Sequence, residues 1–419
     1  MFPALNFNRV STLLSLAVLI ETLCLTYVQE KGGVFYYSSS IVYVVSGLFI
    51  SLLPLIQMSV RSQPSVARWP RYLGVLILIL LAIYYINGLI PLYNYIPIDK
   101  SIADMLPSIK LACERLDHHE VVYGPAPEIW PGAIIPYLPM MWLPFMPAEV
   151  FHFDYRWITF ILQGLGIYMA LRPILKSDTK PPLIPLAIGA FSLFLINNFL
   201  LIKHKDYWSM TQEGLVAGFY MILCSALVRR NYVWIGLAMM ACTLSRYSLL
   251  MWVPLYFGYV WLSQPRSDFW KMALTYGISM ILLFVLPFFI WNPIYFFHIS
   301  DNYLYLSSMF WERFQIAEHR HVNVGLFKFY SVENVTLMFR IGVFLSFLLP
   351  LLLLIWVLRR QRSGSINTRY VGFASLKICI ICFFSFIPMP YFYIFVPPTL
   401  ISYVVLFDYL SGGRSRAIE

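Results

Sequence analysis

Asp104 is the first residue whose type and position suggest chemistry. It stands near the start of an amphipathic stretch, ADMLPSIKLACERL, and Tyr123 follows it about five helical turns later. One explanation is that Asp104 caps a short surface helix, because a carboxylate at that position satisfies free backbone N–H groups. The other is general-base catalysis, since a carboxylate half-buried against apolar residues has its pKa raised toward neutrality. The two roles are compatible, and Asp99, about one turn upstream, is the reserve candidate for the base.

Arg246 is the second candidate, because it interrupts the apolar run ACTLSRYSLLMWVPLYFGYVW. A lone arginine at the end of a hydrophobic segment can simply anchor a helix at an interface. It can equally hold a phosphate group, since the planar guanidinium matches two phosphate oxygens at once. The sequence leaves both explanations open.

A third set of polar residues lies in WERFQIAEHRHVNVGLFKFY, which contains His319, Arg320 and His321. The two histidines are two positions apart, so they face the same way on a strand but not on a helix. A metal site needs more converging ligands than this. The segment is therefore either a cationic, hydrogen-bonding lid over an anionic headgroup or a solvated loop.

Two short motifs look like metal sites but lack the necessary partners. In DHHE (residues 117–120) adjacent side chains point apart on a helix, and neither HExxH nor DxD spacing accompanies them. Cys379 and Cys382 form a CxxC inside the apolar LKICIICFF, with no second ligand pair, so we expect them to pack in a core. No motif for a metal or an organic cofactor is apparent.

The composition identifies the elements that must position these residues. The chain has 419 residues, of which 60% are hydrophobic and 12% charged, and its mean hydropathy is +0.71. A soluble domain cannot hide so much apolar surface, so lipid must be part of the solvent. The apolar runs are continuous rather than alternating, which favours transmembrane helices over a barrel. We predict an all-α integral membrane protein with about twelve spans, at 11–28, 41–58, 72–90, 155–171, 182–202, 211–228, 231–244, 247–262, 271–291, 335–358, 371–387 and 391–409.

The net charge of +10 reports topology rather than a nucleic-acid partner. With the N-terminus inside, 17 of the 30 Lys and Arg residues fall in short inner loops or tails. Most acidic residues fall on the opposite side. This is the positive-inside pattern, and it places both termini in the cytoplasm.

Ionisable residues within the predicted spans need an explanation, because a charge in lipid is costly. They are Glu21, Arg340, Lys377 and Asp408. For Arg340 and Asp408 we expect the side chain to snorkel to an interface. Lys377 is deeper, and we expect it to pair inside the protein with a partner that the sequence does not name.

Two longer outer loops remain, at residues 91–154 and 292–334. The first contains IIPYLPMMWLPFMP (residues 134–147), which is apolar but carries four prolines and so cannot form a straight span. We predict an interfacial or re-entrant segment with Trp130, Tyr137 and Trp142 at the water boundary. The chain is thus expected to form one polytopic membrane domain, residues 1–419.

The first outer loop also resembles a known family. The run from Asp104 to Tyr123, followed by YLPMMWLPF and DYRW, resembles the first outer loop of polytopic glycosyltransferases with the GT-C fold. The likeness is greatest to the polyprenol-phosphate-mannose-dependent mannosyltransferase-like group, glycosyltransferase family 87. Residues 212–255 are similar to a hairpin of that family that ends in a basic residue near the outer face, a position that Arg246 takes here.

The resemblance implies a GT-C-like enzyme on the periplasmic (outer) side of a bacterial inner (cytoplasmic) membrane. Such enzymes move a sugar, here a hexose such as mannose, from a polyprenyl-phosphate carrier to a lipid-linked glycan or glycolipid. It assigns Asp104, with Asp99 in reserve, as the base that activates the acceptor. It further assigns donor-phosphate binding to Arg246, His319, Arg320 and His321, and an acceptor groove to Tyr123, Tyr137 and Trp142.

Two other functions share this topology. A transporter or flippase of lipid-linked sugars would favour buried charges at mid-membrane, and this chain has few. A glycan polymerase or ligase would also work on the outer face, and the sequence separates it poorly from a transferase that adds one sugar.

Overall fold

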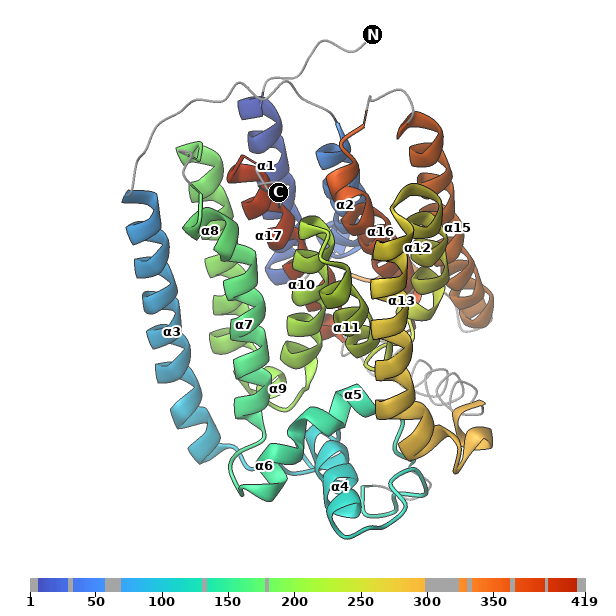
Figure 1. Ribbon diagram of the computed structural model, residues 1–419. Coiled ribbons are helices and arrows are strands. Elements are labelled where there is room, and N and C mark those ends of the chain that lie inside the picture. Colours follow the sequence, from blue (N-terminus) through green and yellow to red (C-terminus); the bar gives the residue numbers. More distant parts are fainter. Residues whose placement is uncertain are drawn as a thin grey trace.

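All twelve predicted spans coincide with helices in the computed structural model, which describes residues 7–28, 33–56, 69–129, 134–177, 181–297, 324–329, 334–361, 366–388 and 391–412 (Figure 1). Among these residues there are isolated β-bridges but no β-strand, so the all-α prediction is confirmed. The helices at the predicted spans are α1 (Phe7–Thr26), α2 (Gly33–Leu52) with η2 (Leu53–Leu55), α3 (Trp69–Tyr95), α7 (Arg156–Leu175), α8 (Leu183–Asn198) with η4 (Phe199–Lys203), α10 (Glu213–Arg229), α11 (Tyr232–Thr243), α12 (Leu249–Ser263), α13 (Arg266–Met280) with η5 (Ile281–Phe289), α15 (Val335–Gln361), η8 (Thr368–Tyr370) with α16 (Val371–Phe386), and η9 (Phe392–Phe395) with α17 (Val396–Leu410).

Eight of these helical segments are long and apolar enough to cross a membrane, which makes the chain a multi-pass membrane protein. They are Phe7–Thr26, Gly33–Leu55, Arg156–Leu175, Leu183–Lys203, Arg266–Phe289, Val335–Gln361, Thr368–Phe386 and Phe392–Leu410. The apolar helices α11 and α12 are shorter.

The centre of the bundle is α17, all of whose residues are buried. It contacts α1, α7, α8, α10 and α16. At the opposite extreme, α13 with η5 buries only Met272 and Phe288 among its described residues, so this segment faces outward although it is more apolar than the segment of α17. Lipid and protein interior are both apolar, and hydropathy alone therefore does not rank helices by burial.

Two glycines bring α10 close to α7. A Cβ atom on Gly218 would lie 2.4 Å from the carbonyl oxygen of Leu162, and one on Gly214 would lie 2.6 Å from Cγ2 of Thr159. Gly214 and Gly218 have the GxxxG spacing that lets transmembrane helices approach closely. This contact fixes the N-terminal end of α10, where Gln212 and Glu213 stand.

A layer of short helices covers one end of the bundle (Figure 1). It consists of α4 (Met105–Asp117), α5 (Pro139–Trp142), η3 (Leu143–Phe145) and α6 (Met146–Val150). We call this the outer layer. At the opposite end α1 begins and α17 ends, and there Phe7 stacks on Tyr409. The end of α7 lies there as well, since the Ser177 hydroxyl donates to the carbonyl of Ser411. The ends of α10 and α15 that carry Arg229 and Arg359 point the same way.

As predicted, the proline-rich segment (residues 134–147) does not form a spanning helix. The predicted position of one of its aromatic residues is wrong. Trp142 is completely buried rather than at a water boundary. Its indole N–H donates to the Tyr123 hydroxyl at 3.1 Å, and such a bond satisfies the polar tip of a buried ring. Tyr137 is half-buried, and Trp130 lies outside the described residues.

The ionisable residues in the spans are mostly paired. Lys377 contacts Glu21 at 2.7 Å, and both side chains are fully buried. Snorkelling was the wrong prediction for Asp408, which is buried and bonded to Arg369 at 2.7 Å and to the Tyr370 hydroxyl at 2.9 Å. Arg340 is exposed, and Cys379 and Cys382 are buried on α16, which confirms core packing for the CxxC.

Candidate functional site

Asp104 occupies the N-cap position of α4, but the helix does not use its carboxylate. No capping hydrogen bond forms from the side chain. One face of α4, with Leu106, Ile109 and Cys113, is buried against the rest of the outer layer. Asp104, at the start of this helix, is half-buried. Burial raises the pKa of the Asp104 carboxyl above its ordinary value. Position and pKa together give Asp104 the property that a general base needs.

Asp99 has a different environment. It is exposed, and its carboxylate accepts a hydrogen bond of 2.7 Å from the backbone N–H of Ser101. Hydrogen bonds from Ser101 lower the pKa of Asp99, which makes it a weaker base. Asp104 is therefore the better candidate of the two.

Arg246 lies in the turn between α11 and α12 and forms an ion pair with Glu213 at the start of α10. The Glu213 side chain is fully buried, whereas that of Arg246 is 19% exposed. Glu213 thus holds the guanidinium from its buried side. The sequence analysis missed Glu213, although the adjacent polar pair Gln212–Glu213 at the end of an apolar span was a usable signal.

Tyr393, at the start of the last span, lies within reach of the charges of both Asp104 and Arg246. Its ring stacks on that of Tyr391, with the ring centroids 4.9 Å apart. The charge of Asp104 also acts on Tyr391. We refer to Asp104, Glu213, Arg246, Tyr391 and Tyr393 as the acid–arginine site.

A backbone hydrogen bond positions the proline-rich segment over this site. The N–H of Met140, on α5, donates to the carbonyl of Leu244 at 3.1 Å, two residues before Arg246. The four prolines of this segment have no backbone N–H, and Met140 supplies one of the remaining donors for the contact. The outer layer is therefore fixed directly to the turn that carries Arg246.

Two further polar residues near the site were not expected from the sequence. His204 follows η4, and its ring lies 4.7 Å from that of Phe392, the residue between Tyr391 and Tyr393. Burial, and secondarily Lys203, lower the pKa of His204 to about 4, so the imidazole is neutral at pH 7. Gln212 is fully buried beside Glu213, and its side-chain amide has no hydrogen-bond partner within the described part of the chain. A buried amide of this kind can donate a hydrogen bond to a ligand or accept one from it.

The predicted acceptor-groove residues divide into two groups. Tyr137 contributes to the surroundings of Tyr393. Tyr123 and Trp142 are buried, and the Tyr123 hydroxyl also donates to the carbonyl of Tyr137 at 3.1 Å. The Tyr123 ring packs 5.6 Å from Phe288 at the end of η5. These two residues therefore fix the first outer loop to the end of a span rather than lining the acid–arginine site.

The remaining predicted site residues do not enter this geometry. His319, Arg320 and His321 lie outside the described residues. His118 and His119 of DHHE are exposed in the turn that ends α4. Within the described ranges, no group of three or more His, Cys, Asp or Glu side chains is arranged to hold a metal ion.

The ion pair between Arg246 and Glu213 gives a prediction about the stability of the fold. Arg246→Gln leaves the buried Glu213 carboxylate without its partner, and we expect a loss of about 2–3 kcal/mol of unfolding free energy. Arg246→Gln combined with Glu213→Gln removes both charges, and most of that stability should return. Thermal unfolding in detergent measures both variants, and a double variant as unstable as the single one would contradict the pairing.

The acid–arginine site is therefore built from four separate parts of the chain: the first outer loop, the start of α10, the turn before α12 and the start of the last span. Comparison with known proteins finds no protein family, no curated protein and no solved structure that matches this chain.

Proposed function

We propose that the protein is a GT-C-like membrane glycosyltransferase that moves a hexose from a polyprenyl-phosphate carrier to a lipid-linked glycan or glycolipid. The observation that carries the proposal is that the charges of Asp104 and of Arg246 both reach the same residue, Tyr393. A base with a raised pKa and a fixed guanidinium are the two groups that transfer from a sugar phosphate requires. Their position between the outer layer and the bundle suits substrates that are held in the membrane by lipid tails.

In the proposed reaction the acceptor hydroxyl attacks the anomeric carbon of the donor sugar. Asp104 takes the hydroxyl proton as the new glycosidic bond forms. The bond between the anomeric carbon and the phosphate oxygen breaks, and its electron pair leaves with the polyprenyl phosphate. Because the phosphate gains negative charge in this step, a guanidinium next to it lowers the barrier. Asp104 finally returns its proton to water.

Glu213 shapes this role of Arg246 in two ways. It fixes the guanidinium through the ion pair, so less conformational freedom is lost when phosphate binds. It also balances the charge of Arg246, so that a leaving phosphate requires additional positive charge. His319, Arg320 and His321 of the second outer loop are the proposed source of that charge.

The proposal also includes twelve spans, cytoplasmic termini and a site on the outer face of a bacterial inner membrane. The basic residues at the end of the bundle opposite the outer layer support this orientation. Donor, acceptor and membrane lipids are the partners that follow from it.

The test uses purified protein in nanodiscs, a panel of radiolabelled polyprenyl-phosphate sugars, and membrane lipid extract as the acceptor source. We expect label from one donor to appear in a lipid-linked product, and the number of sugars added per acceptor separates a transferase from a polymerase. Translocation of the labelled donor without covalent transfer would overturn the proposal in favour of a transporter or flippase.

A further inference from the structure

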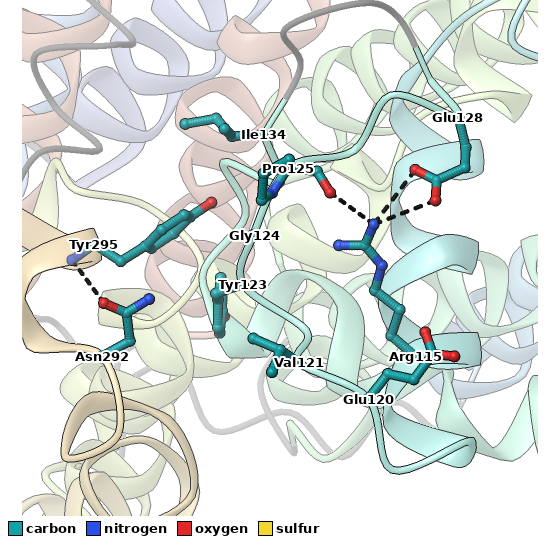
Figure 2. Close-up of a pocket in the computed structure, with 10 residues that line it drawn as sticks. All are labelled: Arg115, Glu120, Val121, Tyr123, Gly124, Pro125, Glu128, Ile134, Asn292 and Tyr295. Carbon is teal, nitrogen blue, oxygen red and sulfur yellow. Dashed lines mark hydrogen bonds and ion pairs between the residues drawn. The ribbon is translucent and has the colours of Figure 1, made fainter.

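A second candidate binding site lies at the far end of α4 from Asp104. It is a pocket of about 560 Å³, within the range of roughly 300–1,000 Å³ that small-molecule sites occupy. Figure 2 shows Tyr295 and Asn292 on one side of it and Arg115, Glu120 and Glu128 on the other, with the 123–125 segment between them. Arg115 is eleven residues after Asp104, so the pocket begins roughly 15 Å from Asp104 along the helix axis.

The single arginine in the pocket is already engaged. Nη2 of Arg115 donates to the carbonyl of Pro125 at 2.7 Å and pairs with Glu128 at 3.3 Å. Its side chain is 11% exposed, whereas that of Glu128 is 56% exposed. Arg115 therefore holds the 122–128 loop in place, and the two carboxylates, on Glu120 and Glu128, give the lining a net negative charge. Such a lining repels phosphate and carboxylate ligands.

The other groups suit a ligand rich in hydroxyls. Glu120 is exposed and Glu128 largely so, and each carboxylate can accept hydrogen bonds from hydroxyl groups. The Asn292 carbonyl oxygen accepts from the N–H of Tyr295 at 3.3 Å, while its amide nitrogen makes no hydrogen bond within the described ranges and is available as a donor. The hydroxyl of Tyr295 donates to the carbonyl of Ile135, which fixes the ring at the pocket wall.

From this lining we infer that the pocket binds an uncharged saccharide unit of the acceptor, with its hydroxyls on Glu120, Glu128 and Asn292 and its C–H face on Tyr295. The inference rests on the proposed function and makes it more specific. A pocket roughly 15 Å from Asp104 along α4 contacts a sugar other than the one that receives the new residue. The acceptor is thus an oligosaccharide, and binding energy from its remote units positions the reacting hydroxyl.

Saturation-transfer difference NMR on the protein in nanodiscs, without any donor, tests the inference. The probes are mannotriose and an N-acetylglucosamine trimer as uncharged ligands, and a glucuronic-acid trimer as the anionic comparison. We expect at least one uncharged trimer to bind and the anionic trimer to bind at least about 10-fold more weakly. Glu120→Gln combined with Glu128→Gln should weaken the uncharged trimer about 10-fold, because charge-assisted hydrogen bonds are replaced by neutral ones.

Two further variants keep the test independent of folding. Asn292→Ala removes the amide donor and, of the other contacts, loses only the 3.3 Å hydrogen bond from the N–H of Tyr295 at a half-buried position, so it should weaken binding with little loss of thermal stability. Asp117→Asn makes a matched change at an exposed acid of α4 that does not line the pocket, and binding should be unchanged. Preferential binding of the anionic trimer, no binding of either uncharged trimer, or full binding by the double variant would each overturn the inference. Binding is measured here without any donor. The result of this test is therefore independent of whether the protein transfers sugar, and failure of one proposal can be told from failure of the other.

Discussion

Asp104→Asn is expected to reduce sugar transfer about 10²- to 10⁴-fold while the protein stays folded. The magnitude is that of a lost general base. The fold should survive for two reasons: the wild-type carboxylate makes no capping bond that the variant would lose, and asparagine is itself a good N-cap residue. Initial rates with the active polyprenyl-phosphate sugar in nanodiscs, together with a thermal unfolding scan, measure the two effects separately.

The pH dependence provides a second readout for the same residue. A base acts only when ionised, so the wild-type rate should fall as the pH is lowered through the pKa of Asp104. Burial raises this pKa, which places the fall above the value of about 3.9 for an ordinary aspartate. In Asp104→Asn this acid limb should disappear from the residual rate.

Asp99→Asn is the matched variant in the same loop, and it decides between the two candidate bases. Asp99 is exposed, and hydrogen bonds from Ser101 lower its pKa, so its loss should leave the transfer rate within about twofold of wild type. Full activity in folded Asp104→Asn, or a large loss in Asp99→Asn, would contradict the assignment of Asp104.

The eight helices long and apolar enough to cross a membrane were predictable, because a bilayer imposes length and composition on any helix that crosses it. Hydropathy placed a helix at each of the twelve positions, including α15, whose observed bounds of Val335–Gln361 extend only three residues beyond the prediction. The prolines between residues 134 and 147 correctly excluded a span, since they break the segment into α5, η3 and α6. These are local properties of the chain.

The pairing of side chains was not predictable, because it depends on which helices meet. Arg246 is an isolated basic residue in the sequence, and only the approach of α10 brings Glu213 to it. Asp408 appeared to be a residue able to snorkel, but Arg369 and Tyr370 reach it from the preceding segment. Tyr393 is one aromatic among many, and the packing of the last span is what brings it within reach of the charges of Asp104 and Arg246.

The pair of Lys377 with Glu21 bears directly on the choice between enzyme and transporter. The Lys377 ammonium donates to Glu21 at 2.7 Å, to the carbonyl of Pro398 at 2.9 Å, and to the Ser402 hydroxyl, which in turn donates to Glu21 at 2.6 Å. An ionisable pair inside a membrane is often a transport or proton-relay site. Here the Lys377 and Glu21 side chains are fully buried, their charged atoms are bonded to one another and to α17, and the acid–arginine site is on other residues. We therefore assign the pair a structural role, in which it joins α1, α16 and α17.

Lys377→Met is expected to destabilise the protein by about 3–5 kcal/mol, because it leaves the Glu21 carboxylate buried without its partner. Glu21→Gln combined with Lys377→Met removes both charges and should recover most of that loss, since the glutamine side chain retains an acceptor oxygen for the Ser402 hydroxyl. Arg340→Met, at an exposed position on α15, is the matched control and should change the stability by less than about 0.5 kcal/mol. A structural pair also requires that the double variant transfer sugar at nearly the wild-type rate, because Asp104 and Arg246 are unchanged. Loss of activity in a double variant that unfolds at the wild-type temperature would instead make the pair a coupling site, and this would favour transport over transfer.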